Sequence, residues 1–545
     1  MRHKLQILCL CAVLAALCLT TVLYLHRHPG SASSPATAGS ADAAQPPNLP
    51  LVTDGVSVTV GDRVYKFTLH ASGETIVCGA PQRDGEADAR ALRTRTVYRF
   101  PVTQNGTSLG AVTLTLDQSD AGTVFYLQSG IPMEDGLLQL AVETAQDTGL
   151  TARPVAHGES AIPDAAAPLW DKPYPSHAAL YLESDGVHLR TARLSVLHAL
   201  GQTVYQYRTP SAGVTLSQAE GKLRVSIPLS CGENEQLATN GVLTAEEGVH
   251  WGDATVAGNV ANLDASATDY RLLADGVYVA MPEDYSPREG DGPHIYRTAT
   301  AWLLGPCTYE SNGPMFTAIG KSIVYSYLDH VNERGFLPTA PTSGWLKSDF
   351  GIGGGFYDTR FNFDTMKRLM HAEAVWDDPE IGETVQRMLK FYCAFADRNQ
   401  FDFLGHPFVP DYADADGNAN GALSSLNHYL SEGLLLLRAG DTYGNSDYSA
   451  RGWRVLNSIN ATYYRWIRDN ADLWYGVYPD GWLRRGDYVE VTYNDLLDAA
   501  ALLSKYGRWE NYEGIQKLLH EKERWLRLAG RPELLQTHAA FTFAG

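Results

Sequence analysis

The hydrophobic period of this chain changes near Pro314, and that change constrains the fold more than any other feature. Before Pro314, apolar and polar residues alternate in short runs, which is the period of half-buried β-strands. After it, apolar residues recur every three or four positions, as in amphipathic helices. The pattern predicts a multidomain α+β protein: an antiparallel β-rich N-terminal half followed by an all-α domain.

Turn dipeptides separate the alternating runs of the first half. Gly61-Asp62 lies between Val56–Val60 and Val64–Leu69, which is a hairpin pattern, and Asn105-Gly106 separates another such pair. Many short strands at this spacing predict one or more domains of sandwich or barrel type over residues 51–295. We see no catalytic motif here and interpret this half as a structural platform.

Apolar stripes of helical period predict about seven helices in the second half. The clearest stripe runs from Leu423 to Leu437 and ends at Gly440. Adjacent antiparallel helices with long loops suit an (α/α)-toroid or barrel, which we predict for residues 296–545. Loops of more than about 12 residues are usually functional. Two such loops, Gly335–Asn362 and Gln400–Ser424, are therefore candidate site loops.

The N-terminus predicts membrane attachment. Arg2 and Lys4 precede an apolar run from Leu5 to Leu25, about the ~20 residues that a spanning helix needs. We predict a cytoplasmic stub and signal anchor over residues 1–27, with a cleaved signal peptide as the alternative. A flexible linker, poor in apolar residues, follows over residues 28–50.

This layout predicts a single-pass plasma-membrane protein whose C-terminal part is extracytoplasmic. A bacterial surface fits best, and the Golgi lumen fits if the protein is eukaryotic. The net charge of −19 argues against a nucleic-acid partner. An anionic ligand would need a local basic cluster.

The first candidate loop contains aromatic and charged side chains that suit a sugar site. Trp345 is a candidate stacking platform, and Tyr357, Asp358 and Arg360 stand directly before a predicted helix. The alternative is that these three residues form a helix cap and a salt bridge. The glycine-rich run 351–355 lacks the context of a phosphate loop.

The second candidate loop contains Asp411 and Tyr412, followed by Asp414-Ala-Asp-Gly-Asn418. The Asp-rich run suggests calcium, but it lacks the twelfth-position Glu of an EF-hand. We therefore interpret it as a turn, and we predict no metal site.

A third segment contains two adjacent arginines in an otherwise acidic protein. Arg484 and Arg485 precede Asp487 and Tyr488, and Asn494 follows in the next predicted helix. Arginine binds a carboxylate through two parallel hydrogen bonds, so this segment is a candidate site for an anionic sugar. The alternative is a surface salt bridge.

These segments together resemble the C-terminal domain of the D-glucuronyl C5-epimerases over roughly the last 200 residues. Tyr357–Ala374 is similar to that family's Trp/Phe-Tyr segment, which opens an early helix. Asp411-Tyr412 with Ser424–Leu437 is similar to its acidic-Tyr pair and Leu-rich helix, although the family has Glu before the Tyr. Arg485–Tyr488, with Asn494, resembles its Asp-Tyr element.

The resemblance implies a hexuronic-acid C5-epimerase acting on an anionic polysaccharide or oligosaccharide by two-base proton abstraction and return, with no cofactor. It implies Asp411, Tyr412 and Tyr488 as catalytic residues. The substrate-binding candidates are Trp345, Tyr357, Asp358, Arg360, His428, Arg484, Arg485, Asp487 and Asn494.

Two alternatives remain open at the sequence level. A hydrolase or polysaccharide lyase on an α/α barrel would also fit, and a hydrolase would need two carboxylates roughly 6.5–9.5 Å apart. The second alternative is a surface protein that binds or assembles glycans without catalysis.

Overall fold

The computed structural model describes residues 55–72, 75–134, 137–159, 161–266 and 270–535. The predicted anchor (residues 1–27) and linker (28–50) lie outside these residues. Within the described part of the chain, no helix combines the length and apolar character needed to cross a membrane.

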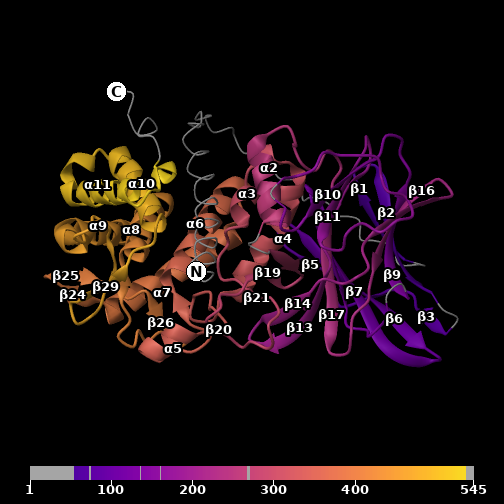
Figure 1. Cartoon of the computed structure of the whole chain (residues 1–545), viewed down its shortest axis with the longest axis horizontal. Helices are drawn as coiled ribbons and strands as arrows, with labels where there is room; N and C mark the ends of the chain where they lie inside the picture. The colour runs from indigo at the N-terminus through magenta and orange to yellow at the C-terminus, as the bar shows by residue number, and fades with distance from the viewer. Residues whose placement is uncertain (1–54, 73–74, 135–136, 160, 267–269, 536–545) are drawn as a thin grey trace. The chain divides into compact units, whose positions relative to one another are not determined.

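The chain divides into two compact units, a sheet unit and a helical unit. The sheet unit contains the described residues up to His330, together with His371–Ile381. The helical unit contains Val331–Met370 and the described residues from Gly382 onward. In Figure 1 the strands of the sheet unit run from indigo to magenta, and the last helices of the helical unit are orange to yellow. The predicted order, a β-rich part followed by a helical part, is confirmed.

Two large antiparallel sheets form the sheet unit. The smaller sheet has the order β1 (Val56–Val60), β2 (Arg63–Ala71), β9 (Leu138–Ala145), β16 (Lys222–Pro228), β15 (Thr215–Ala219). The main path of the larger sheet is β18 (Arg271–Leu273), β19 (Gly276–Ala280), β21 (His294–Arg297), β14 (Val204–Arg208), β13 (Ser195–Gly201), β17 (Glu235–Leu243), β8 (Gly122–Ser129), β7 (Thr107–Ser119), β6 (Thr94–Gln104), β3 (Ile76–Cys78). Its side strands are β4 (Gln82–Arg83), β5 (Asp88–Ala89), β10 (Thr151–Ala156), β11 (Ala178–Glu183) and β12 (His188–Thr191).

The predicted hairpins are confirmed. β1 pairs with β2 across Gly61-Asp62, and β6 pairs with β7 across Asn105-Gly106. The alternating runs do not predict every strand: β10, for example, lies in a segment without a regular period, yet it pairs with β11. Pro154 obscured the pattern because proline cannot donate a ladder hydrogen bond. β10 is a side strand of the larger sheet, and such a strand tolerates proline.

A buried apolar layer lies between the two sheets. The Phe67 ring of the smaller sheet meets the Phe125 ring of the larger sheet edge-on, with 5.3 Å between centroids. Valine, leucine and isoleucine side chains from both sheets surround this pair and are almost fully buried. Helix α4 (Pro314–His330) belongs to the same unit, and its Ser322 hydroxyl donates to Asp117 on β7 at 2.6 Å.

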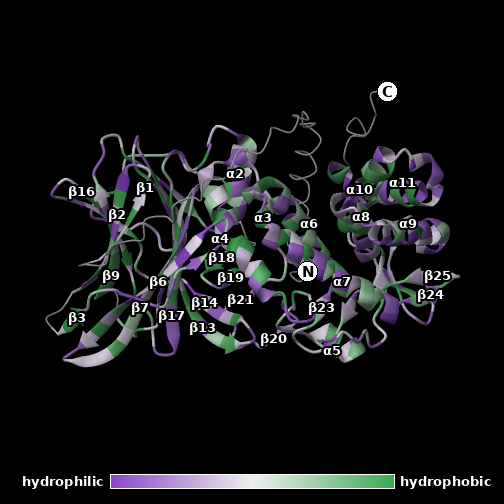
Figure 2. Ribbon diagram, turned by 180° about the vertical axis from the view of Figure 1, so that it is seen from behind, coloured by the Kyte–Doolittle hydropathy of each residue, from purple (hydrophilic) through white to green (hydrophobic). Residues whose placement is uncertain are grey.

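The predicted helical stripes of the second half are confirmed as helices, and most carry alternating polar and apolar stretches (Figure 2). They are α4, α6 (Thr359–Trp376), α7 (Pro379–Asn399), α8 (Leu426–Tyr443), α9 (Ser446–Trp466), α10 (Val491–Lys505) and α11 (Glu513–Leu528). The short helix α5 (Gly344–Phe350) was not predicted. The two candidate loops are more ordered than expected, because they contain α5 and several short strands.

Helices α8 and α9 form a tight antiparallel pair. A Cβ atom added at Gly452 of α9 would lie 2.9 Å from the carbonyl oxygen of Gly433 and 2.8 Å from Leu437 Cγ on α8. Glycine therefore sets how closely the two backbones approach. This pair matters for the site because residues at the start of α8 contribute to it.

We predict that Gly452→Ala destabilises the protein. Alanine gains up to about 1 kcal/mol of helix propensity, but the backbone contact forces the helices apart at a cost of about 1–3 kcal/mol. The net loss in the free energy of unfolding is measured by chemical unfolding, monitored by circular dichroism. Gly258→Ala in α2 (Ala254–Val260) is the matched control, because a Cβ atom there meets nothing within 4 Å. If both variants had a higher free energy of unfolding than the parent protein, close packing at Gly452 would be contradicted.

Candidate functional site

Short strand pairings bring together the three segments that the sequence singles out. β23 (Tyr357–Asp358) pairs with β26 (Tyr412–Ala413), so that Asp358 lies opposite Tyr412. β27 (Ser424–Ser425) pairs with β28 (Trp474–Val477), which in turn pairs with β29 (Leu483–Gly486). All these segments lie in the helical unit.

Asp411 connects the two small sheets. Its backbone N–H donates to the carbonyl of Leu423 at 2.7 Å, and its carbonyl accepts the N–H of Thr359 at 2.9 Å. Its carboxyl oxygen Oδ1 accepts the N–H of Ser425 at 2.8 Å. The residue is completely buried. It therefore holds the starts of α6 and α8 beside β26.

Three tyrosines meet at this point. The hydroxyls of Tyr412 and Tyr475 lie 3.4 Å apart, and the rings of Tyr475 and Tyr488 meet edge-on at 5.5 Å. Trp345 packs edge-on against Tyr412, also at 5.5 Å. Sequence reasoning missed Tyr475, which connects the two predicted catalytic tyrosines. The aromatic and β-branched residues of Trp474–Tyr478 were the available signal, because such residues favour β-strands.

Two arginines stack on aromatic rings beside these tyrosines. The Arg485 guanidinium lies 4.5 Å from the centroid of Trp345 and donates to Asp349 at 2.8 Å. Arg484 lies 4.3 Å from the centroid of Tyr478. Arg485 also has a positive φ of 65°, a left-handed conformation that is unfavourable for a non-glycine residue and is found preferentially at functional sites.

Buried carboxyl groups lie beneath the tyrosines. Burial raises the pKa of Asp358 to about 7 and that of Glu432 to about 8. It also raises the pKa of Asp411 well above its usual range. Glu432 accepts a hydrogen bond from the Tyr392 hydroxyl at 2.6 Å. These groups therefore hold their protons at pH values where carboxyl groups are ordinarily ionised, which lowers the negative charge beneath the tyrosines.

His428 belongs to the same layer. Burial, and then the positive charge of Arg360, lower its pKa well below the usual range, so the ring is neutral. Its Nδ1 lies 2.8 Å from the Thr359 hydroxyl and 3.7 Å from Asp411 Oδ2. The imidazole also contacts the Tyr412 ring at 5.5 Å between centroids. The predicted residues Asp358, Asp411, Tyr412 and His428 therefore lie together.

The Tyr412 and Tyr475 phenols are held in their protonated forms. Burial raises the pKa of both groups well above the usual range, and the neighbouring phenols and carboxyl groups raise it further. A phenolate at Tyr412 would require a cation nearby. The neighbours described above are instead phenols, acids, the Trp345 ring and the neutral His428 imidazole, so Tyr412 stays protonated and can donate a proton.

Other predicted site residues have structural partners. Arg360 binds Asp364 at 3.1 Å and Asp495 at 2.6 Å. The buried ring of Tyr357 packs against three phenylalanines, Phe336, Phe391 and Phe395. Asp358 accepts the N–H of Phe361 at 3.0 Å, as a residue that caps α6 does.

The Asp487 carboxylate anchors the Tyr488 segment. Lys522 donates to Asp487 at 2.7 Å and to the carbonyl of Tyr488 at 2.6 Å. Thr492 donates to the second carboxylate oxygen at 2.6 Å. Asn494, also predicted, is half-buried in the first turn of α10. Asp487 therefore positions Tyr488 from below, and the 42% exposed Tyr488 side chain reaches the surface.

The Asp-rich turn satisfies its own polar groups. Asp414 accepts the N–H groups of Asp416 and Asn418, each at 2.9 Å. Asp416 forms an ion pair with Arg334 at 2.8 Å. Across the described ranges, no group of three or more His, Cys, Asp or Glu side chains could hold a metal ion.

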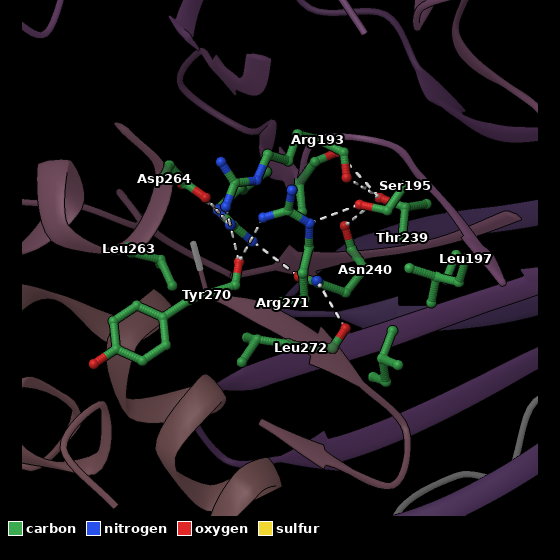
Figure 3. A pocket seen from close by; sticks show the side chains of 14 residues that line it. Arg193, Ser195, Leu197, Thr239, Asn240, Leu263, Asp264, Tyr270, Arg271 and Leu272 are labelled. Atoms are coloured by element: carbon green, nitrogen blue, oxygen red, sulfur yellow. Dashed lines mark hydrogen bonds and ion pairs between the residues drawn. The ribbon is translucent and has the colours of Figure 1, made fainter. Parts of the chain in front are cut away.

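A second polar cluster lies within the sheet unit (Figure 3). Arg190 donates to Asp264 and to Asn240, and Arg271 donates to Ser195 at 2.7 Å. The cavity that these residues line has a volume of only about 10 Å³, enough for about one water molecule. A sugar cannot enter it, so we assign this cluster to the packing of the sheet unit.

We predict that Glu432→Gln reduces the pH dependence of stability. Glu432 binds its proton more tightly when folded, so unfolding releases that proton between about pH 4.5 and about pH 8. The free energy of unfolding then falls as pH rises through this window, by up to about 1.4 kcal/mol per pH unit. Chemical unfolding at several pH values measures the slope. Glu510→Gln, at an exposed position, is the control. If the free energy of unfolding changed equally with pH in both variants, a raised pKa at Glu432 would be contradicted.

No protein-family model and no curated protein matches the chain. Among solved structures, a D-mannose isomerase is 16% identical, with a TM-score of 0.33, over 41% of this chain and 60% of that one. A cellobiose 2-epimerase from Bacillus thermoamylovorans B4167 is 14% identical, with a TM-score of 0.34, over 42% and 58%. A bacterial glucoamylase bound to acarbose is 10% identical, with a TM-score of 0.23, over 88% and 62%. The chain thus spans about 60% of the first of these.

Proposed function

We propose that the helical unit is a carbohydrate epimerase that inverts the carboxylate-bearing carbon of a hexuronic acid within a glycan chain. The convergence of Tyr412, Tyr475 and Tyr488 carries this proposal. Inversion needs an acid and a base on opposite faces of the sugar ring, and no organic cofactor. Two of these tyrosines were predicted as that pair from segments far apart in the sequence, and Tyr475 contacts both.

In the proposed mechanism the tyrosines have different roles. The Tyr488 oxygen, as phenolate, removes the proton from the carbon next to the carboxylate. Tyr412, whose raised pKa keeps it protonated, returns a proton to the opposite face. The Tyr475 hydroxyl holds Tyr412 in place. Solvent resets both phenols, so one proton is taken and one is given in each turnover.

The intermediate in this mechanism carries enolate charge on the substrate carboxylate. Cationic donors placed where charge develops lower the barrier to such a step. Arg485, fixed by Trp345 and Asp349, is the donor we assign to this role. Arg360 is already bound by two acids, so the structure favours Arg485 over it.

The scaffold proposed for this chemistry is an (α/α)-toroid. Consecutive helices α8 and α9 pack as an antiparallel pair, and α10 and α11 pack together next to them. The signal anchor expected within residues 1–27 would hold the enzyme on the extracytoplasmic side of a membrane.

We predict that Tyr412→Phe and Tyr488→Phe each lower exchange of solvent hydrogen into a uronic-acid polymer by about a hundredfold or more. Each change removes one hydroxyl and keeps the ring packing. Incorporation of deuterium at the carbon next to the carboxylate, read by NMR, is the measurement. Tyr475→Phe should lower exchange less, because the Tyr475 hydroxyl only orients Tyr412. The control is Tyr464→Phe, a 57% exposed tyrosine on α9.

Three outcomes would contradict the epimerase. Unchanged exchange in both variants would remove the tyrosines from the mechanism. A product that absorbs in the ultraviolet would indicate a lyase, which eliminates the neighbouring substituent after the same first step. A new reducing end without that absorbance would indicate a hydrolase.

The exchange rate should also rise with pH. A phenol ordinarily loses its proton near pH 10, so the base form is scarce at pH 7 and increases about tenfold per pH unit. Tyr412 stays protonated over this range because its pKa is raised. We therefore expect exchange to increase from pH 7 to pH 9. A profile that falls over this range would exclude a phenolate base.

A further inference from the structure

The tip of the β28–β29 hairpin presents a large apolar side chain to solvent. Trp482 is 68% exposed, although tryptophan is usually well buried. It lies one residue before β29 and seven residues after Tyr475 in a hairpin that pairs Val477 with Leu483. At about 3.3 Å per residue, the tip extends roughly 10 Å from Tyr475 along the strand.

The hairpin tip is built as a rigid turn. The N–H of Tyr478 donates to the carbonyl of Trp482 at 3.0 Å, and the N–H of Gly481 donates to the carbonyl of Tyr478 at 2.8 Å. The N–H of Trp482 donates to the Asp480 carboxylate at 3.0 Å. Gly481 has a φ of 80°, which suits glycine at this position of the turn. The turn therefore fixes the backbone that carries the exposed indole.

Charged donors flank the indole. Arg484 forms an ion pair with Asp480 and lies over the Tyr478 ring, and its side chain is 48% exposed. Arg485 is 45% exposed and pairs with Asp349. A guanidinium has five N–H donors, so each arginine has capacity for a further carboxylate. The tip thus combines an apolar platform with two cations.

We propose that this tip is a second sugar subsite, in which Trp482 stacks on a sugar ring next to the one being epimerised and Arg484 contacts that sugar's carboxylate. This inference rests on the proposed function and adds the class of the neighbouring sugar, which is a second uronic acid. A rigid aromatic side chain gives large contact area with little loss of conformational entropy. The subsite makes the substrate a chain of uronic-acid units and not a free monosaccharide.

Calorimetric binding of sugars of different length to the full chain tests the subsite. The probes are polymannuronate and polygalacturonate, their monosaccharides, and uncharged cello-oligosaccharides. We expect the parent protein to bind one charged polymer more tightly than its monosaccharide. Trp482→Ala should weaken polymer binding roughly tenfold and leave monosaccharide binding unchanged, as expected for the loss of an aromatic anchor. Trp482→Phe should restore part of the affinity.

Matched controls separate the subsite from the chemistry. Tyr464→Ala removes an exposed aromatic side chain from α9 and should leave polymer binding unchanged. Tyr412→Phe should lose hydrogen exchange and keep the length dependence of binding. If Trp482→Ala behaves like Tyr464→Ala, or if the parent binds none of the charged polymers, the subsite is wrong. Preference for the cello-oligosaccharides would overturn the role of Arg484. Binding that depends on Trp482 without any exchange would refute the epimerase and keep the subsite.

Discussion

The site depends on a single buried residue, Asp411. Its backbone fixes Thr359 and Leu423, and its carboxyl group fixes Ser425. Transferring an ionised carboxylate from water to this position would cost several kcal/mol, and the raised pKa avoids that cost by keeping the group protonated. The same interactions place Tyr412, the next residue, against the other tyrosines. Asp411 therefore acts as a structural centre whose position determines where the phenols lie.

Charge is distributed in two layers around this centre. The lower layer contains three carboxyl groups and one imidazole whose shifted pKa values favour the neutral forms. The upper layer contains Arg484 and Arg485, each paired with one exposed carboxylate and stacked on an aromatic ring. Burial keeps the Tyr412 phenol protonated, whereas the cations above it would attract an anionic ligand. This separation suits chemistry in which a carboxylate must bind without ionising the acid beneath it.

Much of this arrangement follows from the sequence, and part of it does not. The period change predicted the order of strands and helices because packed elements repeat every 2 or 3.6 residues. It also identified the loops that contain Trp345 and Tyr412, whereas Tyr488 was chosen from a third segment through the family resemblance. Two-residue strands such as β23 and β26 have no period, so the sequence could not predict that they pair. The partners of Arg360 and Asp487 also required the structure: Asp495 lies 135 residues beyond Arg360, and Lys522 meets Asp487 only in the folded chain.

The interleaving of these short strands has a consequence for how the protein folds. Tyr412 and Tyr475 are 63 residues apart, and the pairings that unite them involve only a few hydrogen bonds each. Closing a loop of this length lowers the conformational entropy of the chain before the stabilising contacts form, so non-local pairs form slowly. Helices such as α8 and α9 are local, so we expect them to form early. We expect the tyrosine cluster to assemble late, after nearly all of the helical unit has left the ribosome. A chain interrupted before α11 also lacks Lys522, which fixes Tyr488.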